Sequence, residues 1–312
     1  LLKQPFSDYF NEPKLIAIST ILPLLSLLTI PRTYAIKLLY RDQQLKHIFI
    51  VDLAFFFSMM VITVIYLLRF SVLSFEYMTV IYILGTTISA LTGLIIVRKK
   101  LTFTLSKGDI DFKRFVNFSI PMTMTSALFS VPKMLDVFFI QKFFGNTAIV
   151  GVYGSAKTLY RAFDITSDAA YGLIYPSAVK QIENENHEGV MALLTKSISF
   201  MLMAFTIVIV ILELGASEFF ITLLLPAKYH DAIGFFNLLL LAAFGVPFMT
   251  SALIIYAEGK PYLVLFMASI AGMFFVATLY ITGQLGLQNL APLGIISFNY
   301  IFAIMTFIYL KK

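Results

Sequence analysis

The sequence predicts an all-α polytopic transmembrane helix bundle, on the strength of its composition and its uncharged runs. Of the 312 residues, 59% are hydrophobic and 13% are charged, against about 25% charged residues in a typical soluble domain. The mean hydropathy is +0.89. Uncharged runs recur that approach or exceed the roughly 20 residues a helix needs to cross a bilayer. This composition excludes a soluble enzyme, a nucleic-acid-binding protein and a disordered chain.

Nine membrane-crossing helices are predicted. The clearest run is Pro261–Leu310, fifty residues without Asp, Glu, Lys, Arg or His, which is too long for one crossing and divides at Gly283–Pro292. The expected helices cover about residues 15–39, 53–68, 77–97, 113–144, 149–178, 197–212, 232–257, 261–283 and 292–310.

Prolines and glycines mark where several of these helices bend. The first contains Pro23 and Pro31, and the seventh is interrupted by Gly245 and Pro247. A bundle tolerates such residues because neighbouring helices satisfy the freed backbone groups. The third helix ends cleanly at a basic triplet, Arg98–Lys100.

The loop cations predict the orientation. Fourteen Lys and Arg residues fall on one side of the nine helices: Lys37, Arg41, Lys46, Arg98, Lys99, Lys100, Lys107, Lys113, Arg114, Lys180, Lys196, Lys260, Lys311 and Lys312. Five fall on the other: Lys3, Lys14, Arg69, Lys142 and Lys228. Because Lys and Arg concentrate in cytoplasmic loops, the first side is assigned to the cytoplasm. We therefore expect a multi-pass protein of the cell inner (plasma) membrane with a cytoplasmic C-terminus.

This orientation places Leu1 outside. The segment Leu1–Lys14 reads as a polar loop, and we expect an odd number of helices, three, to precede it in the parent protein. The bundle would then have twelve helices in two pseudo-symmetric six-helix lobes. Residues 1–105 would form the second half of the N-terminal lobe and residues 106–312 the C-terminal lobe, with the basic loop 98–114 as the boundary.

The fifth predicted helix, 149–178, carries a row of charges. At 100° per residue and with Lys157 at zero, Arg161 lies at about 40°, Asp164 at about −20° and Asp168 at about 20°. Four tyrosines fall between about −60° and 0°: Tyr153, Tyr160, Tyr171 and Tyr175. The opposite face is apolar: Leu159, Ala162, Phe163, Ala170 and Leu173. Each charge facing lipid would cost roughly 2.5–3.5 kcal/mol, so this row is expected to face protein or water.

Two interpretations of this row stay open, and they are compatible. In the first, Lys157 and Arg161 form intramembrane salt bridges with Asp164 and Asp168 and hold helices together. In the second, the cations line a water-filled cavity and receive an anionic substrate, with the tyrosines suited to sugar rings or lipid head groups.

Charges elsewhere in the spans are fewer. On the fourth helix, Lys133 and Asp136 are one turn apart and are expected to pair with each other, beside Pro121 and Pro132. Arg32, next to Pro31, is expected to extend towards the cytoplasmic interface. Glu213 and Glu258 lie near helix ends and are interpreted as interfacial.

Catalytic and metal-binding patterns are not found. Cys is absent, and the three histidines, His47, His187 and His230, fall in separate loops. Gly151–Thr158 resembles a phosphate-binding loop but has Ala156 in place of its second glycine and lies within a predicted membrane helix. No loop is long enough for a catalytic domain, so we expect no enzyme activity, no cofactor and no metal.

The order of motifs from Phe115 onward resembles the polysaccharide-repeat (O-antigen type) flippases of the multidrug/oligosaccharidyl-lipid/polysaccharide exporter superfamily. The residues that carry the resemblance are SIP (Ser119–Pro121), LDVFFIQKFFG (Leu135–Gly145), VGVYGSA (Val150–Ala156), LLLPAKYHDAIGFFNLLLLAAFGVP (Leu223–Pro247) and, earlier, TYAIKLLYRDQQLKHIFIVDL (Thr33–Leu53). The resemblance implies two lobes around a cationic cavity that opens alternately to either side. It also places the chain from just before the family's fourth helix through its twelfth.

The function implied is the outward flipping of polyprenyl-diphosphate-linked oligosaccharides for surface polysaccharide biosynthesis. By this resemblance Lys133, Lys157 and Arg161 would contact the diphosphate or acidic sugars, with Tyr153 and Tyr160 beside them in the cavity. Candidates for ion coupling are Asp136, Asp164 and Asp168. Expected partners are the lipid-linked oligosaccharide, the bilayer and other polysaccharide assembly proteins, and no nucleic acid. The alternatives are a cation-coupled multidrug exporter of the same superfamily and, less favoured, a membrane-embedded polysaccharide polymerase.

Overall fold

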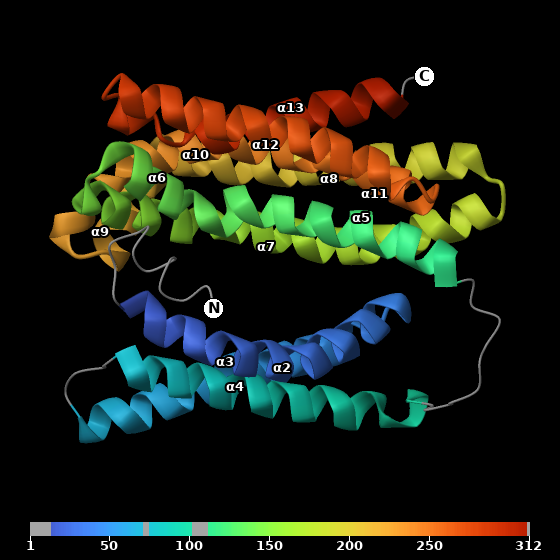
Figure 1. Ribbon diagram of the computed structural model, residues 1–312, viewed down its shortest axis with the longest axis horizontal. Coiled ribbons are helices and arrows are strands. Elements are labelled where there is room, and N and C mark those ends of the chain that lie inside the picture. Colours follow the sequence, from blue (N-terminus) through green and yellow to red (C-terminus); the bar gives the residue numbers. More distant parts are fainter. Residues whose placement is uncertain (1–13, 71–74, 102–111, 311–312) are drawn as a thin grey trace. The chain divides into compact units, whose positions relative to one another are not determined.

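The computed structural model describes residues 14–70, 75–101 and 112–310, which are helical in all but short connections (Figure 1). The predicted outer loop before Lys14, most of the basic boundary loop, and Lys3, Lys107, Lys311 and Lys312 lie outside the described residues. The chain divides into two compact units, unit 1 (Leu1–Gly108) and unit 2 (Asp109–Lys312). The assignment of these units to half a lobe and a whole lobe stays a prediction.

The described residues of unit 1 form three long helices. They are α2 (Lys14–Arg41), α3 (Leu45–Arg69) and α4 (Phe75–Val97), followed by the 3₁₀ turn η1 (Arg98–Lys100). Unit 2 contains α5 (Phe112–Ser130), the π-helical segment η2 (Val131–Leu135), α6 (Asp136–Phe144), α7 (Thr147–Glu183), α8 (His187–Ile211), the π-helical segment η3 (Leu212–Ala216), α9 (Ser217–Leu224), η4 (Ala227–Tyr229), α10 (Ala232–Met249), α11 (Ser251–Ala257), α12 (Pro261–Gln284), η5 (Gln288–Leu290) and α13 (Leu293–Leu310).

The all-α prediction is confirmed, and each of the nine predicted ranges is helical in the described residues. By length and composition, seven helices among the described residues could cross a membrane, or eight if the bent pair α5–α6 counts as one span. The remaining predicted crossing is α7, which carries the charged row, and its crossing stays a prediction. The chain is thus a multi-pass membrane protein.

Close packing in both units depends on small residues, as is usual where lipid removes the hydrophobic drive between helices. In unit 1, a Cβ atom added at Gly93 would lie 2.9 Å from Ala35 Cβ, so α2 and α4 approach closely at this point. In unit 2, α10 lies at the centre and packs against α7, α8 and α13. Its Gly245 faces α13, where an added Cβ atom would lie 3.0 Å from Asn299 Cβ.

Unit 1 is joined at one polar node. The Nη2 of Arg32 on α2 lies 2.5 Å from the Asp52 carboxylate on α3. Its Nε donates to Ser89 Oγ on α4 at 2.9 Å, and that hydroxyl donates to the Val51 carbonyl. Arg32 therefore bonds to α3 and α4, a contact that the sequence analysis did not predict, and its extension towards the interface stays a prediction. A guanidinium needs partners in an apolar bundle, and Asp52 supplies the partner that the expectation overlooked.

A second contact joins the α2–α3 turn to the end of α4. Asp42 accepts a hydrogen bond from Arg41 Nε at 3.1 Å and pairs with Lys100. These two cations, with the Lys100 hydrogen bond as the largest cause, hold the pKa of Asp42 below its usual range. The contact fixes the basic end of unit 1.

The Arg32 node yields a stability prediction. Replacing Arg32 with Met should lower the thermal stability of the detergent-solubilised protein, because Asp52 and Ser89 lose their shared donor. In a double-mutant cycle with Asp52→Asn, the coupling should be about 1 kcal/mol, since both side chains are partly exposed. Arg69→Met, at the exposed end of α3, is the matched control and should have little effect. A coupling indistinguishable from zero would contradict the node.

Candidate functional site

The fourth predicted helix is broken near its middle. Helix α5 continues through Pro121 but becomes π-helical at Val131–Leu135, and α6 leaves at an angle of 55°. Pro132 lies within this π-helical segment, and proline cannot donate the hydrogen bond that a continuous helix would require. The break exposes backbone groups that side chains then satisfy.

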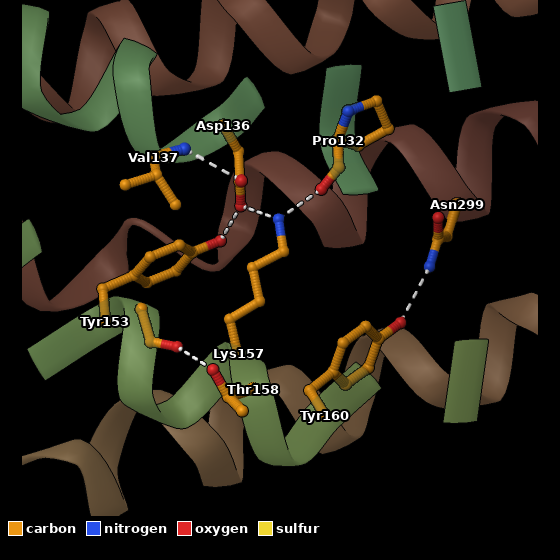
Figure 2. Close-up of polar contacts among 9 residues, drawn as sticks. Pro132, Asp136, Val137, Tyr153, Lys157, Thr158, Tyr160 and Asn299 are labelled. Atoms are coloured by element: carbon orange, nitrogen blue, oxygen red, sulfur yellow. Dashed lines mark hydrogen bonds and ion pairs between the residues drawn. The ribbon is translucent and has the colours of Figure 1, made fainter. Parts of the chain in front are cut away.

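A buried polar network occupies the break (Figure 2). The Asp136 carboxylate accepts a hydrogen bond from the Val137 N–H at 2.8 Å, and another from the Tyr153 hydroxyl. Lys157 Nζ forms an ion pair with the same carboxylate and donates to the Pro132 carbonyl at 2.6 Å. Asp136 and Tyr153 are fully buried, and Lys157 is 7% exposed. We call Asp136, Lys157 and Tyr153 the buried latch, because they join α7 to the break.

Tyr160 belongs to a second buried contact, one to two turns further along α7. Its hydroxyl accepts a hydrogen bond from Asn299 Nδ2 on α13 at 3.4 Å, and the same amide donates to the Ala242 carbonyl on α10 at 3.1 Å. Figure 2 shows the Tyr160 hydroxyl directed at Asn299. Tyr171 similarly donates to the Val246 carbonyl at 2.9 Å. These tyrosines join α7 to the centre of unit 2.

The remaining charges of the row are more accessible. Lys133 Nζ lies 2.8 Å from the Asp168 carboxylate, and the Asp168 side chain is 59% exposed. Arg161 is exposed, and Asp164 is partly buried. We call Lys133, Arg161 and Asp168 the exposed charged row.

The structure therefore corrects two expectations about pairing. Lys133 pairs with Asp168, not with Asp136, and Lys157 pairs with Asp136, not with a carboxylate of its own helix. Both pairs connect the broken helix to α7. The reason is geometric: the 55° break turns Asp136 into the interior next to Lys157, whereas Lys133 remains partly exposed.

The charges and tyrosines of α7 do not form one uniform face. Viewed down the axis of α7, the average direction of the buried side chains of Tyr153, Tyr160 and Phe163 lies roughly 60° or more from the direction of Lys157. The predicted row thus straddles the edge of the packed interface. Tyr153, Tyr160 and Lys157 are buried, Tyr171 and Tyr175 are partly buried, and Arg161 and Asp168 are exposed. Phe163, expected on the opposite apolar face, packs against Phe205 with ring centroids 5.0 Å apart.

Sequence reasoning missed three polar groups that matter here. Asp52 lies in an apolar stretch, and the same energetic argument applied to acidic residues would have found it. Asn299 lies in the uncharged run 261–310 and carries no charge to draw notice. The Pro132 carbonyl could be found only once the helix break was known.

The buried latch and the exposed pair should differ in their contribution to stability. Asp136→Asn leaves Lys157 charged and unpaired in the interior, and should lower the free energy of unfolding by about 3–5 kcal/mol. Asp168→Asn is the matched control, and should cost less than about 1 kcal/mol because its pair with Lys133 is exposed. Thermal and denaturant unfolding in detergent measure both.

The double variant Asp136→Asn with Lys157→Met removes both buried charges, and it should recover much of the stability lost in Asp136→Asn. Equal losses from Asp136→Asn and Asp168→Asn would contradict the division into a buried latch and an exposed charged row.

Comparison with known proteins identifies the family. A family model described as polysaccharide biosynthesis protein matches residues 1–234. The match includes the broken helix and all of α7, and hence the buried latch and the exposed charged row. A comparison with curated proteins finds no match. Since the family match covers most of the chain, the chain belongs to the polysaccharide biosynthesis protein family.

Proposed function

We propose that the chain is a membrane transporter that flips polyprenyl-diphosphate-linked oligosaccharide units from the cytoplasmic to the outer leaflet by alternating access. Membership of the polysaccharide biosynthesis protein family supports a role in polysaccharide biosynthesis. The multi-pass helical fold supports a role in transport. The observation that carries the proposal is the exposed charged row, Lys133, Arg161 and Asp168, set within an apolar bundle.

The energetic argument starts from Arg161. Its side chain is exposed, and among the described residues it forms no ion pair. An arginine facing hydrocarbon at mid-helix would cost roughly 2.5–3.5 kcal/mol or more. The face that carries Arg161 is therefore proposed to border an aqueous path. A guanidinium also matches the oxygens of a phosphate in a bidentate manner.

The Lys133–Asp168 pair gives the proposed path a second, exchangeable cation. Because this pair is exposed, its net stabilisation is small, and an arriving diphosphate can replace Asp168 as the partner of Lys133. Arg161 and Lys133 would then bind the same anion from α7 and from the break between α5 and α6. The proposed roles of Lys157, Tyr153 and Tyr160 are to fix α7 so that this pair of cations is held in place. Asp136, Asp164 and Asp168 stay the candidates for coupling to protons or sodium.

A cation-coupled multidrug exporter would bind cationic compounds, for which the exposed positive charge of Arg161 is unfavourable. A membrane-embedded polymerase would alter the length of the polymer but leave single repeat units on the outer leaflet. Both alternatives are therefore outcomes that the next experiment can distinguish.

Replacing Arg161 with Ala should reduce surface polysaccharide by about tenfold or more at equal expression, because one charge-assisted contact to the substrate is worth about 1.5–3 kcal/mol. Arg161→Lys should retain part of the export. Lys196→Ala, which removes an exposed cation of α8, is the control and should export normally. Normal export from Arg161→Ala would refute the proposed site. Lipid-linked repeat units should accumulate on the cytoplasmic side, and drug sensitivity should not change.

The aqueous path can be tested separately from transport. This chain contains no cysteine, so Arg161→Cys or Asp168→Cys introduces the single thiol of these 312 residues. A membrane-impermeant cationic thiosulfonate reacts with thiolates, which form in water and not in hydrocarbon. Both variants should be labelled in intact membranes or inverted vesicles. Phe200→Cys, at an apolar residue of α8 that is 68% exposed, should resist. Equal resistance at all three positions would contradict an aqueous path.

A further inference from the structure

Unit 2 contains a second feature that the proposed transport path does not use, a polar pocket built from three connections. A cavity of about 790 Å³ is bordered by the α6–α7 turn, by the residues that precede α10, and by η5. Its polar side chains are Asn146, His230, Asp231, Gln288 and Asn289. Apolar residues, among them Val152, Phe235 and Leu238, also line it. The volume lies within the range typical of small-ligand sites.

The local structure holds these polar groups at helix ends. The Asn146 side-chain carbonyl caps α7 by accepting hydrogen bonds from the N–H groups of Ala148 and Ile149, at 3.0 and 3.4 Å. Asn146 also lines the pocket, and its side-chain NH₂ is a potential donor. His230 and Asp231 directly precede α10, and Gln288 and Asn289 belong to η5. The pocket thus gathers donors and acceptors from the ends of three helical segments.

The lining residues indicate which ligands fit. The described lining residues include Asp231 and neither Lys nor Arg, and this set favours a neutral ligand over a phosphate or another anion. It has one histidine and one carboxylate, and no group of three or more His, Cys, Asp or Glu occurs in the described residues, so it is unsuited to a metal ion. Its side-chain amides, imidazole and carboxylate can both donate and accept hydrogen bonds. Combined with the apolar lining residues, among them Phe235, this set matches a neutral, hydroxyl-rich ligand.

Gly234 keeps part of the pocket open. It lies in the first turn of α10 and lines the cavity, and a Cβ atom added to it would meet nothing within 4 Å. A side chain can therefore begin at this position without a clash at its Cβ, and a large one is expected to reduce the space of the cavity. This gives the pocket a blocking variant that leaves its own polar residues unchanged.

We propose that this pocket is a saccharide-binding site, which contacts the sugar portion of the substrate by hydrogen bonds to its hydroxyl groups. The inference rests on the proposed flipping function and adds a second site, separate from the exposed charged row that would hold the diphosphate. All three connections belong to the side that the loop cations assign to the exterior. The pocket would thus receive the sugars as they reach the outer surface.

Binding is tested with Gly234→Cys in the otherwise cysteine-free chain. A water-soluble maleimide labels the thiol, and the rate is measured with and without two probes. The first is the free repeat-unit oligosaccharide, released by mild acid from the lipid-linked pool of cells that carry the protein. The second is inorganic pyrophosphate. The oligosaccharide should slow labelling at least about threefold, as expected at about two-thirds occupancy or more, and pyrophosphate should have no effect. Protection by pyrophosphate alone, or by neither probe, would overturn the proposal.

Function is tested with Gly234→Trp, which should reduce surface polysaccharide about tenfold, as expected if roughly 1.4 kcal/mol of sugar binding is lost. Gly272→Trp is the matched control, because a Cβ at this glycine of α12 also meets nothing within 4 Å and Gly272 does not line the pocket. It should export normally at equal expression. Normal export from Gly234→Trp would overturn the role of the pocket. Protection of Gly234→Cys by the oligosaccharide, together with normal export from Arg161→Ala, would support the saccharide-binding pocket. The same pair of results would refute only the proposal that the exposed charged row binds substrate.

Discussion

An ionised side chain inside an apolar bundle must have either a partner or water, and this constraint organises both units. In unit 1 it brings Arg32, Asp52 and Ser89 together from three helices. In unit 2 it places Lys157 against Asp136 in the interior. Because a single buried charge is so costly, each of these contacts fixes the rotation of the helices that contribute to it. The packing of small residues, such as Gly93 against Ala35, then brings the backbones close.

The broken helix gives this constraint a particular form in unit 2. A π-helical segment with a proline leaves backbone groups that a regular α-helix would pair. Here the Val137 N–H is satisfied by Asp136 and the Pro132 carbonyl by Lys157. The ion pair and the break therefore stabilise each other. The contacts of the buried latch stabilise the bend between α5 and α6, and this bend places the Asp136 carboxylate next to Lys157 of α7.

The sequence was sufficient to predict where the helices lie, and insufficient to predict which side chains meet. Uncharged runs place spans such as 77–97 and 261–283 because each must match the bilayer. Helix ends were less accurate: α3 begins at Leu45 and α8 at His187, since both helices continue through polar residues outside the apolar run. The sequence also picked out the charged residues of α7 as a group, and the expectation that they avoid lipid stays a prediction. Their partners are 21 to 35 residues away on another helix, as in the Lys133–Asp168 pair, and periodicity within one helix carries no information about that distance.

The division of α7 between interior and surface also explains why a structural and a functional interpretation of its charges are both reasonable. A salt bridge that holds helices together must be buried to be strong, and a cation that receives a substrate must be accessible. A fully buried face cannot provide an accessible cation, and a fully exposed face cannot provide a buried salt bridge. A row of charges at the boundary between the packed interface and the surface can provide both. Lys157 lies on the inner side of that edge and Arg161, one turn further along, on the outer side. A substrate that binds at Arg161 and Lys133 would therefore act directly on both helices that the buried latch joins, α7 and the broken helix.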